Sequence, residues 1–421
     1  MELLQQMPCK GVIYNYGFAD HFKTGYLSVD FFMPLTKENA TGMSLLAGML
    51  CRGCKKYPGM DLISRYLAKN YGASLSVTAS KAGELEILTF AFSFLDREYT
   101  IDGEDVRRAM IALFRELVFA PLAENGAFRS DYMEQEKSNL IDKITGIFND
   151  KRVYALEQCK SLMCENEAFG IGEYGDIELV KAYNEKSLYD YFRKLLDEAW
   201  VMVNYVGKER ELFMDALTEG LSPRTTEMPS TQVVEFSGKV REIVDPLDLN
   251  QSKLTLGFRL GKAALEKPMA CRLFNVLYGG SATSKLFMNV RERLSLCYYC
   301  SSRLDRLKNV MFVASGIEAE KYEQARNEIE HQLKNVAQGE FTQEEMDNAK
   351  AYLIDSFRSF YDNESALASM MITGTLHGKV CLPEEEIQAV QAVTREDLVA
   401  VAREVQLDTV YFLKGVHHEG E

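Results

Sequence analysis

The sequence predicts an α+β fold made of two homologous halves, each with antiparallel-type sheets packed against helices. The first observation is an internal repeat: AFRSDYMEQEKSNLIDKI, from Ala127, resembles EFTQEEMDNAKAYLIDSF, from Glu340. Phe128 matches Phe341 at an offset of 213 (341 − 128 = 213), and the same offset holds along the segment. The second observation is that each half opens with a strand-like run and closes with a capped helix and an apolar strand. A duplicated unit of roughly 200 residues accounts for both observations.

Strands are predicted at matching places in the two halves. YLSVDFFM, from Tyr26, and KLTLGFRL, from Lys253, alternate along their length, which predicts the first strand of each sheet. Two helices should follow in each half, and then two further strands. ELEILTFAFSF, from Glu84, and NVMFVASGIE, from Asn309, are the clearest of these later strands.

The last part of each half is predicted to hold two longer helices, a short amphipathic helix and a final strand. Three helix starts carry capping signals, which are Thr342 with Glu345, Ser187 with Asp190, and Thr394 with Asp397. The runs VMVNYVG, which ends at Gly207, and TVYFLKG, which ends at Gly415, predict the closing strands.

A linker is predicted between the halves, because the segment 220–232 concentrates Pro, Ser and Thr without apolar periodicity. We therefore expect a first αβ domain over 1–222, a linker over 223–237 and a second αβ domain over 238–421.

Composition excludes several classes of function. The net charge of −14 argues against nucleic-acid binding, which needs a surplus of Lys and Arg. The longest apolar runs are too short to cross a membrane, and the N-terminus lacks the pattern of a secretory signal. Nine cysteines, an odd number, indicate mostly reduced thiols, so we expect a cytoplasmic protein.

A longer motif in the second half, YGGSATSKLFMNVRERLSLCYY (278–299), carries a resemblance to a known family. With the two αβ halves, it resembles the pitrilysin/insulinase family of zinc metallopeptidases, which includes the mitochondrial processing peptidase. The resemblance runs from about Gly11 to Gly415. The motif positions that match are Gly279, Gly280, Ser284, Leu286, Phe287, Val290, Arg291, Glu292, Leu296 and Tyr298.

Active members of that family carry an inverted zinc motif, His-x-x-Glu-His, on a first-half helix. Aligning the motif with SLLAGMLCRG (44–53) places Ser44 and Gly48 at the histidines and Ala47 at the general base. The third ligand, a glutamate, lies seven residues after another acid. In EKSNLIDKI the first acid is Glu136, so the ligand position falls on Lys143, whereas a slip of one residue selects Asp142.

The resemblance therefore implies a chain without catalytic residues and without bound zinc. Glycine and alanine have no donor atom, a serine hydroxyl is a poor zinc ligand, and a lysine repels a dication. The five histidines, which are His21, His331, His377, His417 and His418, include no pair spaced i, i+4. The alternative is that this helix is an ordinary core helix, with Met43, Leu46, Met49 and Leu50 facing inward, and both interpretations can hold together.

The resemblance implies that a substrate-binding motif remains. In the family, an arginine and a tyrosine seven residues apart help to position the peptide, and Arg291 and Tyr298 match them. An arginine fork donates to carbonyls or carboxylates, and a tyrosine hydroxyl donates to an oxyanion. We expect Gly279 and Gly280, in the same motif, on the substrate-binding side. The alternative is that Arg291 makes a helix-end salt bridge and Tyr298 is a sheet aromatic.

Family members of this length pair into two-chain chambers, often with one zinc-bearing and one silent chain. The resemblance thus implies a zinc-bearing homologue as partner, or a second copy of this chain, and a peptide or unfolded polypeptide as substrate. The alternative is a stand-alone peptide-binding or scaffold protein, with a link to the modification of elongation factor P as a context. An enzyme with other chemistry lacks a supporting group of residues.

Two Cys-x-x-Cys pairs, Cys51/Cys54 and Cys297/Cys300, form another candidate site. Four thiolates can bind zinc, but the second pair lies on a predicted strand. Since alternate strand residues face opposite ways, positions three apart should diverge. We therefore expect buried thiols here.

Overall fold

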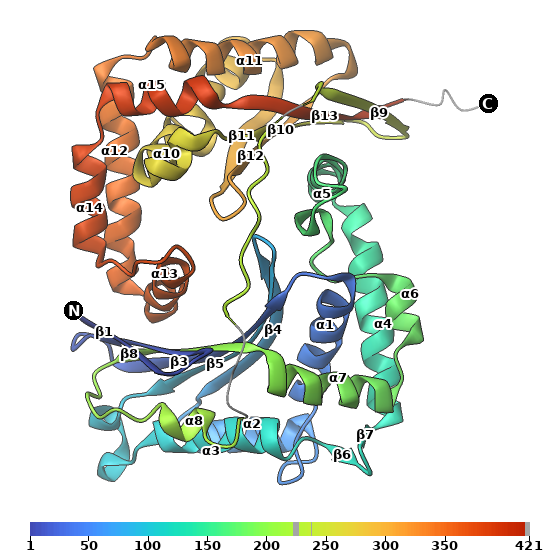
Figure 1. The fold of residues 1–421 in the computed structure, drawn as a ribbon, viewed down its shortest axis with the longest axis vertical. Helices are drawn as coiled ribbons and strands as arrows, with labels where there is room; N and C mark the ends of the chain where they lie inside the picture. Colours follow the sequence, from blue (N-terminus) through green and yellow to red (C-terminus); the bar gives the residue numbers. More distant parts are fainter. Residues whose placement is uncertain (222–226, 237, 417–421) are drawn as a thin grey trace. The chain divides into compact units, whose positions relative to one another are not determined.

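The computed structural model describes residues 1–221, 227–236 and 238–416 (Figure 1). The predicted linker positions 223–226 and 237, together with His417 and His418, lie outside the described residues. The fold is α+β, as predicted, and it divides into two compact units. The first unit holds Met1–Thr145, Ile171–Thr231 and Phe360–Leu382, and the second holds Gly146–Gly170, Gln232–Ser359 and Pro383–Glu421.

The sheet of the first unit has six strands in the order β1-β2-β8-β3-β5-β4. Their bounds are β1 Glu2–Cys9, β2 Val12–Phe18, β8 Trp200–Gly207, β3 Thr24–Pro34, β5 Leu85–Leu95 and β4 Ser74–Ala82. Neighbouring strands are antiparallel except β2 and β8, which are parallel. β4 is an edge strand, which places one side of its backbone outside the ladder.

Within the part of the chain that the structure describes, the sheet of the second unit repeats this plan without a counterpart of β1. Its order is β11-β12-β10-β13-β9, with β11 Cys297–Asp305, β12 Val310–Ile317, β10 Ser252–Arg259, β13 Gln406–Gly415 and β9 Arg241–Leu247. The parallel pair here is β9 with β13. The duplication predicted from the sequence is therefore present in the order and direction of the strands.

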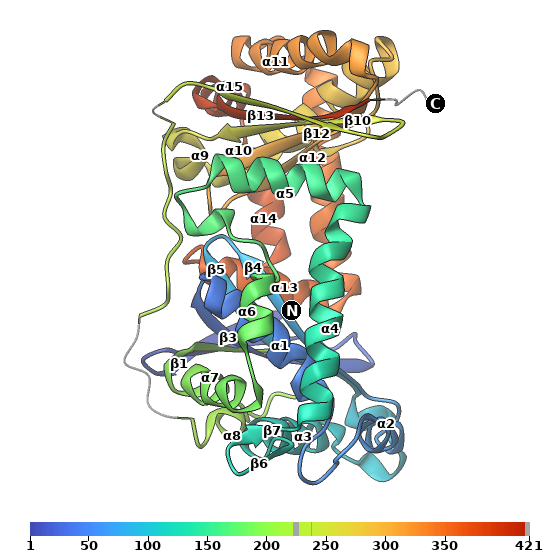
Figure 2. The ribbon, with the colours of Figure 1, turned by 90° about the vertical axis from the view of Figure 1, so that its right-hand side faces the viewer.

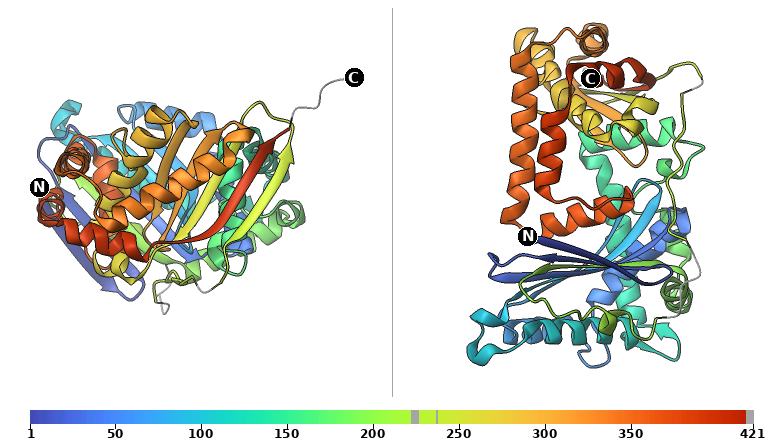
Figure 3. Two further views of the ribbon diagram at one scale, coloured as in Figure 1. Left: turned by 90° about the horizontal axis from the view of Figure 1, so that it is seen from above. Right: turned by 60° about the vertical axis from the view of Figure 1, so that its left-hand side comes forward.

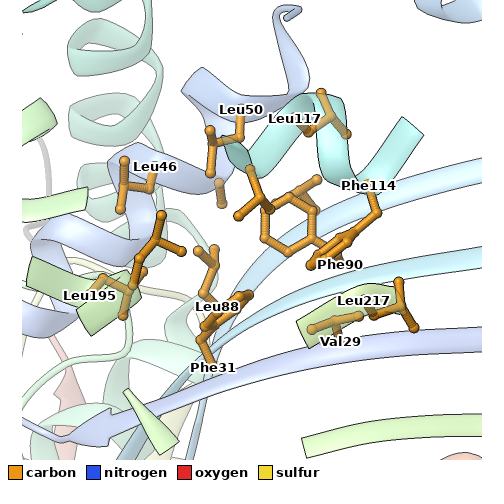
Figure 4. Close-up of a cluster of buried hydrophobic side chains, with 14 of the residues drawn as sticks. Val29, Phe31, Leu46, Leu50, Leu88, Phe90, Phe114, Leu117, Leu195 and Leu217 are labelled. Atoms are coloured by element: carbon orange, nitrogen blue, oxygen red, sulfur yellow. The ribbon is translucent and has the colours of Figure 1, made fainter. Parts of the chain in front are cut away.

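Helices pack on both faces of each sheet, with most of them on one face. The longer helices of the first unit are α1 Lys37–Cys51, α2 Met60–Lys69, α3 Val106–Phe119, α4 Ser130–Gly146 (its last residue in the second unit) and α7 Glu185–Glu198, with the short α6 Ile177–Ala182 and α8 Asp215–Thr218. Leu46 and Leu50 of α1 pack in the core with Phe31, Leu88 and Phe90 of the sheet (Figure 4). No helix among the described residues is both long enough and apolar enough to span a membrane.

The helices of the second unit include α10 Pro268–Asn275, α11 Tyr322–Gln338, α12 Gln343–Arg358, α14 Pro383–Ala392, α15 Arg395–Glu404 and the short α9 Lys262–Glu266. Two π-helical segments, η5 Val276–Gly280 and η6 Leu286–Arg293, lie in the second-half motif. Such segments are rare and occur often at functional sites.

One pair of repeated helices is exchanged between the units. α5 (Lys151–Met163) and α13 (Glu364–Leu376) occupy the same place in the repeat, 213 residues apart (364 − 151 = 213). α5, from the first half of the chain, packs on β10 and β13 in the second unit (Figure 2). α13, from the second half, packs on β8 and β3 in the first unit (Figures 1 and 3). The expected boundaries 1–222 and 238–421 follow the chain, whereas the compact units follow this exchange.

A buried ion cluster holds the exchanged segment 146–170 on the second unit. Arg259 of β10 donates to Glu167 (Nη1 to Oε2, 3.0 Å) and to Asp408 (Nε to Oδ2, 2.9 Å). Lys308 lies 2.6 Å from Glu167 Oε2 and is fully buried. Burial would raise the pKa of Glu167, but the hydrogen bonds from Arg259 and Lys308 outweigh it and hold the pKa below its usual value.

The helix caps confirm two of the three predicted starts. The confirmed capping boxes are Thr342 with Glu345, and Thr394 with Asp397. The prediction for Ser187 is wrong, because α7 begins three residues earlier. Asn184 is the N-cap, and its side chain accepts from the amide of Ser187, while the Ser187 hydroxyl accepts from the amide of Asn184.

Candidate functional site

Helix α1 carries the predicted degenerate motif. Its N-terminus is capped by Thr36, and the side chains of Met43, Leu46, Met49 and Leu50 are buried, as the core-helix interpretation predicted. The opposite side of the helix, with Ser44, Ala47 and Gly48, meets α4 at a cavity. Burial of the apolar face thus fixes the orientation of α1, so that the motif positions lie toward α4.

We call this the α1–α4 cavity, and its volume is about 300 Å³. Its lining residues are Ser44, Ala47, Gly48, Cys51, Val77, Thr78, Ala79, Glu136, Asn139, Leu140 and Lys143. All four positions that the motif comparison selected are therefore brought together. Asp142, the alternative to Lys143, is exposed and is not among the lining residues.

An ion pair that the sequence did not predict closes one side of the cavity. Arg52, one helical turn after Gly48, donates through Nε to Glu136 Oε1 at 2.8 Å, and its Nη2 donates to the same oxygen. Both side chains are mostly buried, and the guanidinium also lies 5.4 Å from the ring centre of Tyr132. From the sequence pattern, Glu136 was identified only as the acid that precedes the ligand position by seven residues. The sequence hint was the i, i+4 spacing of Gly48 and Arg52, which places the Arg52 side chain on the same face of α1 as the motif positions.

The α1–α4 cavity does not fit the zinc ion that the family resemblance implies. Ala47 and Gly48 have no donor atom, and the Lys143 ammonium repels a cation. A β-carbon placed on Gly48 would lie 2.1 Å from Glu136 Oε2, so a histidine cannot stand there with Glu136 in its present position. Among residues 1–221, 227–236 and 238–416, no cluster of three or more His, Cys, Asp or Glu side chains is arranged to hold a metal ion.

The second-half motif forms a separate pocket of about 340 Å³, which we call the η6–β11 pocket. Its lining residues are Arg291, Glu292, Ser295, Leu296, Cys297, Tyr298, Glu318 and Lys321. Arg291 and Tyr298, which the sequence selected as a pair, therefore line one pocket. The Tyr298 side chain is 61% exposed, which is unusual for a sheet aromatic.

A β-bulge explains the exposure of Tyr298. Cys297 pairs with Ile317 and Tyr299 pairs with Gly316, so two steps on β11 match one step on β12 and Tyr298 is the extra residue. A bulge re-aims the side chains around it. The Tyr299 ring then lies over Gly316, where a β-carbon would approach the ring to 2.5 Å.

Arg291 is partly exposed at the end of η6. Its nearest carboxylate is that of Glu292, at 3.5 Å, and its guanidinium lies 4.6 Å from the ring centre of Phe287. An exposed pair with a sequence neighbour contributes little to stability. The salt-bridge alternative therefore gives Arg291 no strong structural role, and Arg291 lines the pocket together with Tyr298.

Gly279 and Gly280 do not line the η6–β11 pocket. Gly279 is buried, and a β-carbon there would lie 2.6 Å from Ser302 Oγ. A β-carbon on Gly280 would lie 2.9 Å from the Asn275 amide. Packing against Ser302 of β11 accounts for Gly279, and close approach to Asn275 of α10 accounts for Gly280.

The divergence predicted for Cys297 and Cys300 is wrong, because the bulge at Tyr298 returns both to one face of β11. The two thiols lie within hydrogen-bond reach. The hydrogen bond from Cys300 and the charge of Arg291 lower the pKa of Cys297 despite its partial burial. The same bond and burial raise the pKa of Cys300 well above its usual value. In the other pair, Cys51 lines the α1–α4 cavity.

Comparison with known proteins identifies relatives of this chain. The family model described as "Peptidase M16 inactive domain" matches residues 184–353. The probable inactive metalloprotease YmfF of Bacillus subtilis is 31% identical over 402 residues, 94% of each chain. A conserved protein from Enterococcus faecalis superposes with a TM-score of 0.92 at 27% identity over 100% of both chains. The peptidase M16 inactive domain from Pseudomonas fluorescens superposes with a TM-score of 0.80 at 16% identity, also over 100% of both chains. The chain therefore belongs to the pitrilysin/insulinase family of zinc metallopeptidases, peptidase family M16, as a homologue of the inactive type that lacks the His-x-x-Glu-His motif.

Proposed function

We propose that this chain is the non-catalytic subunit of a two-chain peptidase. It pairs with a zinc-bearing homologue, which supplies the hydrolytic centre, and it contributes contacts to a peptide or unfolded polypeptide in a shared chamber. All nine cysteines are in the reduced state, in keeping with a cytoplasmic location for the pair.

The observation that carries the proposal is the difference between the two sites. In the α1–α4 cavity, Ala47 and Gly48 offer nothing to a metal or to a water molecule that must lose a proton. In the η6–β11 pocket, Arg291 and Tyr298 keep the donors that suit peptide carbonyls and a developing oxyanion. A chain with substrate contacts but no general base fits a supporting role.

The proposal includes the absence of zinc from the α1–α4 cavity. The Arg52–Glu136 pair already satisfies the carboxylate nearest Gly48, and Lys143 brings a positive charge to the ligand position. A metal ion there would have to displace Arg52 from Glu136, and the Lys143 ammonium would repel it.

A second candidate is a stand-alone peptide-binding protein, alone or as a dimer of this chain. The observation that favours it is that the α1–α4 cavity is open and is lined by Val77, Thr78 and Ala79 of the edge strand β4. Extended peptides add to such edges through main-chain hydrogen bonds. Under this candidate, peptides bind without a partner and are never cut.

The test is co-expression of this chain with a zinc-bearing homologue from the same genome, followed by size-exclusion chromatography and steady-state cleavage of an internally quenched peptide. We expect co-elution, and we expect Arg291→Ala in this chain to lower kcat/KM of the pair by about tenfold, the effect of one charged hydrogen bond. Arg293→Ala is the matched control, because Arg293 is exposed on the same segment and does not line the pocket.

Separate elution of the two chains, with a kcat/KM that does not respond to Arg291→Ala, would contradict the pairing. Peptide binding by the isolated chain would then favour the second candidate.

A further inference from the structure

The charge of the α1–α4 cavity differs from that of a metal site. Two lining residues carry charge, Glu136 and Lys143, and Arg52 neutralises Glu136. Lys143 has no carboxylate partner among the described residues, and its ammonium lies 3.9 Å from the ring centre of Tyr174. The cavity therefore holds one unbalanced positive charge, in a chain whose net charge is −14.

The polar groups around this charge include donors without strong acceptors. Ser44 Oγ is buried and has no hydrogen-bond partner among the described residues. The Asn139 amide makes one long contact, 3.3 Å, with Glu136, and Thr78 contributes an exposed hydroxyl. A buried hydroxyl without a partner is costly, and an acceptor from a ligand would satisfy it.

The remaining lining is small or apolar, with Ala47, Gly48, Val77, Ala79 and Leu140. About 300 Å³ is enough for a small polar group with one or two modest side chains. A ligand with one negative charge and otherwise small, apolar surface matches this lining.

We propose that the α1–α4 cavity binds a carboxylate of a peptide, with Lys143 as its counter-ion and Ser44 and Asn139 as hydrogen-bond donors. This inference rests on the proposed peptide-binding function and names the group that the site recognises. The carboxylate comes from a free peptide C-terminus or from an acidic side chain, and the chemistry of recognition is the same for both.

The experiment measures binding of fluorescein-labelled hexa-alanine to the full chain by fluorescence anisotropy. The free acid, the C-terminal amide, and an amide with a terminal aspartate are compared. We expect the free acid to bind about tenfold more tightly than the amide, as a charged hydrogen bond implies. If the aspartyl amide binds as tightly as the free acid, an acidic side chain can also supply the carboxylate. If it binds as weakly as the plain amide, only the peptide C-terminus supplies it.

The variant Lys143→Met should bring the ratio of free acid to amide close to one. Lys143 is exposed, so the fold should persist, and circular dichroism checks it. Lys186→Met, which removes an exposed lysine on α7, is the matched control and should keep the ratio. Equal binding of acid and amide to the native chain, or a ratio that survives Lys143→Met, overturns the inference and leaves peptide binding intact. No binding of any probe overturns both this inference and peptide binding by the isolated chain.

Discussion

The carboxylate of Glu136 lies directly against the α-carbon of Gly48, so that a β-carbon on Gly48 would approach Oε2 to 2.1 Å. Arg52 holds that carboxylate through two hydrogen bonds to Oε1. The glycine at a former ligand position and the ion pair are therefore mutually dependent. A side chain at 48 requires Glu136 to move, and movement of Glu136 leaves Arg52 unpaired.

Gly48→Ala should destabilise the protein by about 1–2 kcal/mol, because overpacking against the fixed carboxylate outweighs the gain in helix propensity. In a Glu136→Ala background the same substitution should stabilise by about 0.5–1 kcal/mol, the ordinary effect of alanine in a helix. Urea denaturation of the four proteins gives the coupling free energy.

Gly146→Ala is the control for this cycle. Gly146 ends α4 with helical backbone angles, and a β-carbon there meets nothing within 4 Å. It should be neutral or stabilising in both backgrounds. A coupling free energy near zero between positions 48 and 136 would show that the carboxylate does not block Gly48.

Glu86 of β5 should make the stability depend on pH. It is fully buried, neither carboxylate oxygen has a hydrogen-bond partner among the described residues, and burial raises its pKa to about 9. The folded state thus holds the proton more tightly than the unfolded state. The contribution of Glu86 to stability is greatest below pH 4.5 and is lost as the pH rises toward about 9, at up to about 1.4 kcal/mol per pH unit.

Glu86→Gln should remove this dependence, so its stability relative to the native protein should increase with pH. Urea denaturation at several pH values measures the difference. Asp30, whose pKa burial raises to about 6, acts in the same direction in both proteins and cancels. Glu124→Gln, at an exposed glutamate, should leave the pH profile unchanged. Parallel profiles for Glu86→Gln and the native protein would refute the assignment.

Glu167→Gln should destabilise the chain by about 3 kcal/mol, because it leaves the buried charges of Arg259 and Lys308 without a common partner. The pKa of Glu167 lies below its usual 4.5, so this stabilisation is present above pH 4.5 and is lost as the pH falls through the folded-state pKa. Glu165→Gln tests specificity, because Glu165 lies on the same segment as Glu167. Its exposed pair with Arg241 of β9 should contribute less than about 1 kcal/mol. Equal effects of the two substitutions would remove the special role of the cluster.

Cys297 should react with iodoacetamide about tenfold faster than Cys300 near neutral pH. The hydrogen bond from Cys300 and the charge of Arg291 lower the pKa of Cys297, and Cys300 is buried with a raised pKa. Peptide mapping by mass spectrometry gives both rates. Arg291→Ala should slow the labelling of Cys297, whereas Arg293→Ala should not. Preferential labelling of Cys300 is the outcome that contradicts this assignment.

The sequence repeat predicted much of the fold. α4 begins at Ser130 and α12 at Gln343, and α5 and α13 have the same length at the same offset. The strand runs around Tyr26 and Lys253 lie in β3 and β10. Apolar alternation and duplicated spacing are local signals, and local signals suffice to find elements.

Other features of the fold depend on contacts that local patterns do not encode. α5 and α13 have apolar faces, but periodicity does not say which sheet each face meets, so their exchange between units was not predicted. The bulge at Tyr298 depends on pairing with β12, where Gly316 accommodates the Tyr299 ring. The start of α7 moved because Asn184 competes with Ser187 for the cap, and either residue type serves there.

The candidate site was likewise only partly predictable from the sequence. Motif spacing selected Ser44, Ala47, Gly48 and Lys143, and one cavity contains them all. The Arg52–Glu136 pair joins residues 84 positions apart in sequence, and only the packing of α1 on α4 brings them together. Gly279 and Gly280 matched the motif, but packing rather than pocket access explains them.

The most direct test of the proposed function compares peptide cleavage by three samples: this chain, its zinc-bearing homologue, and their equimolar mixture. We expect cleavage only by the mixture, with complete loss on addition of a chelator, since Ala47 stands at the general-base position of this chain and the homologue would supply the zinc. Full activity of the homologue alone, unchanged when this chain is added, would contradict the account. So would chelator-sensitive cleavage by this chain alone.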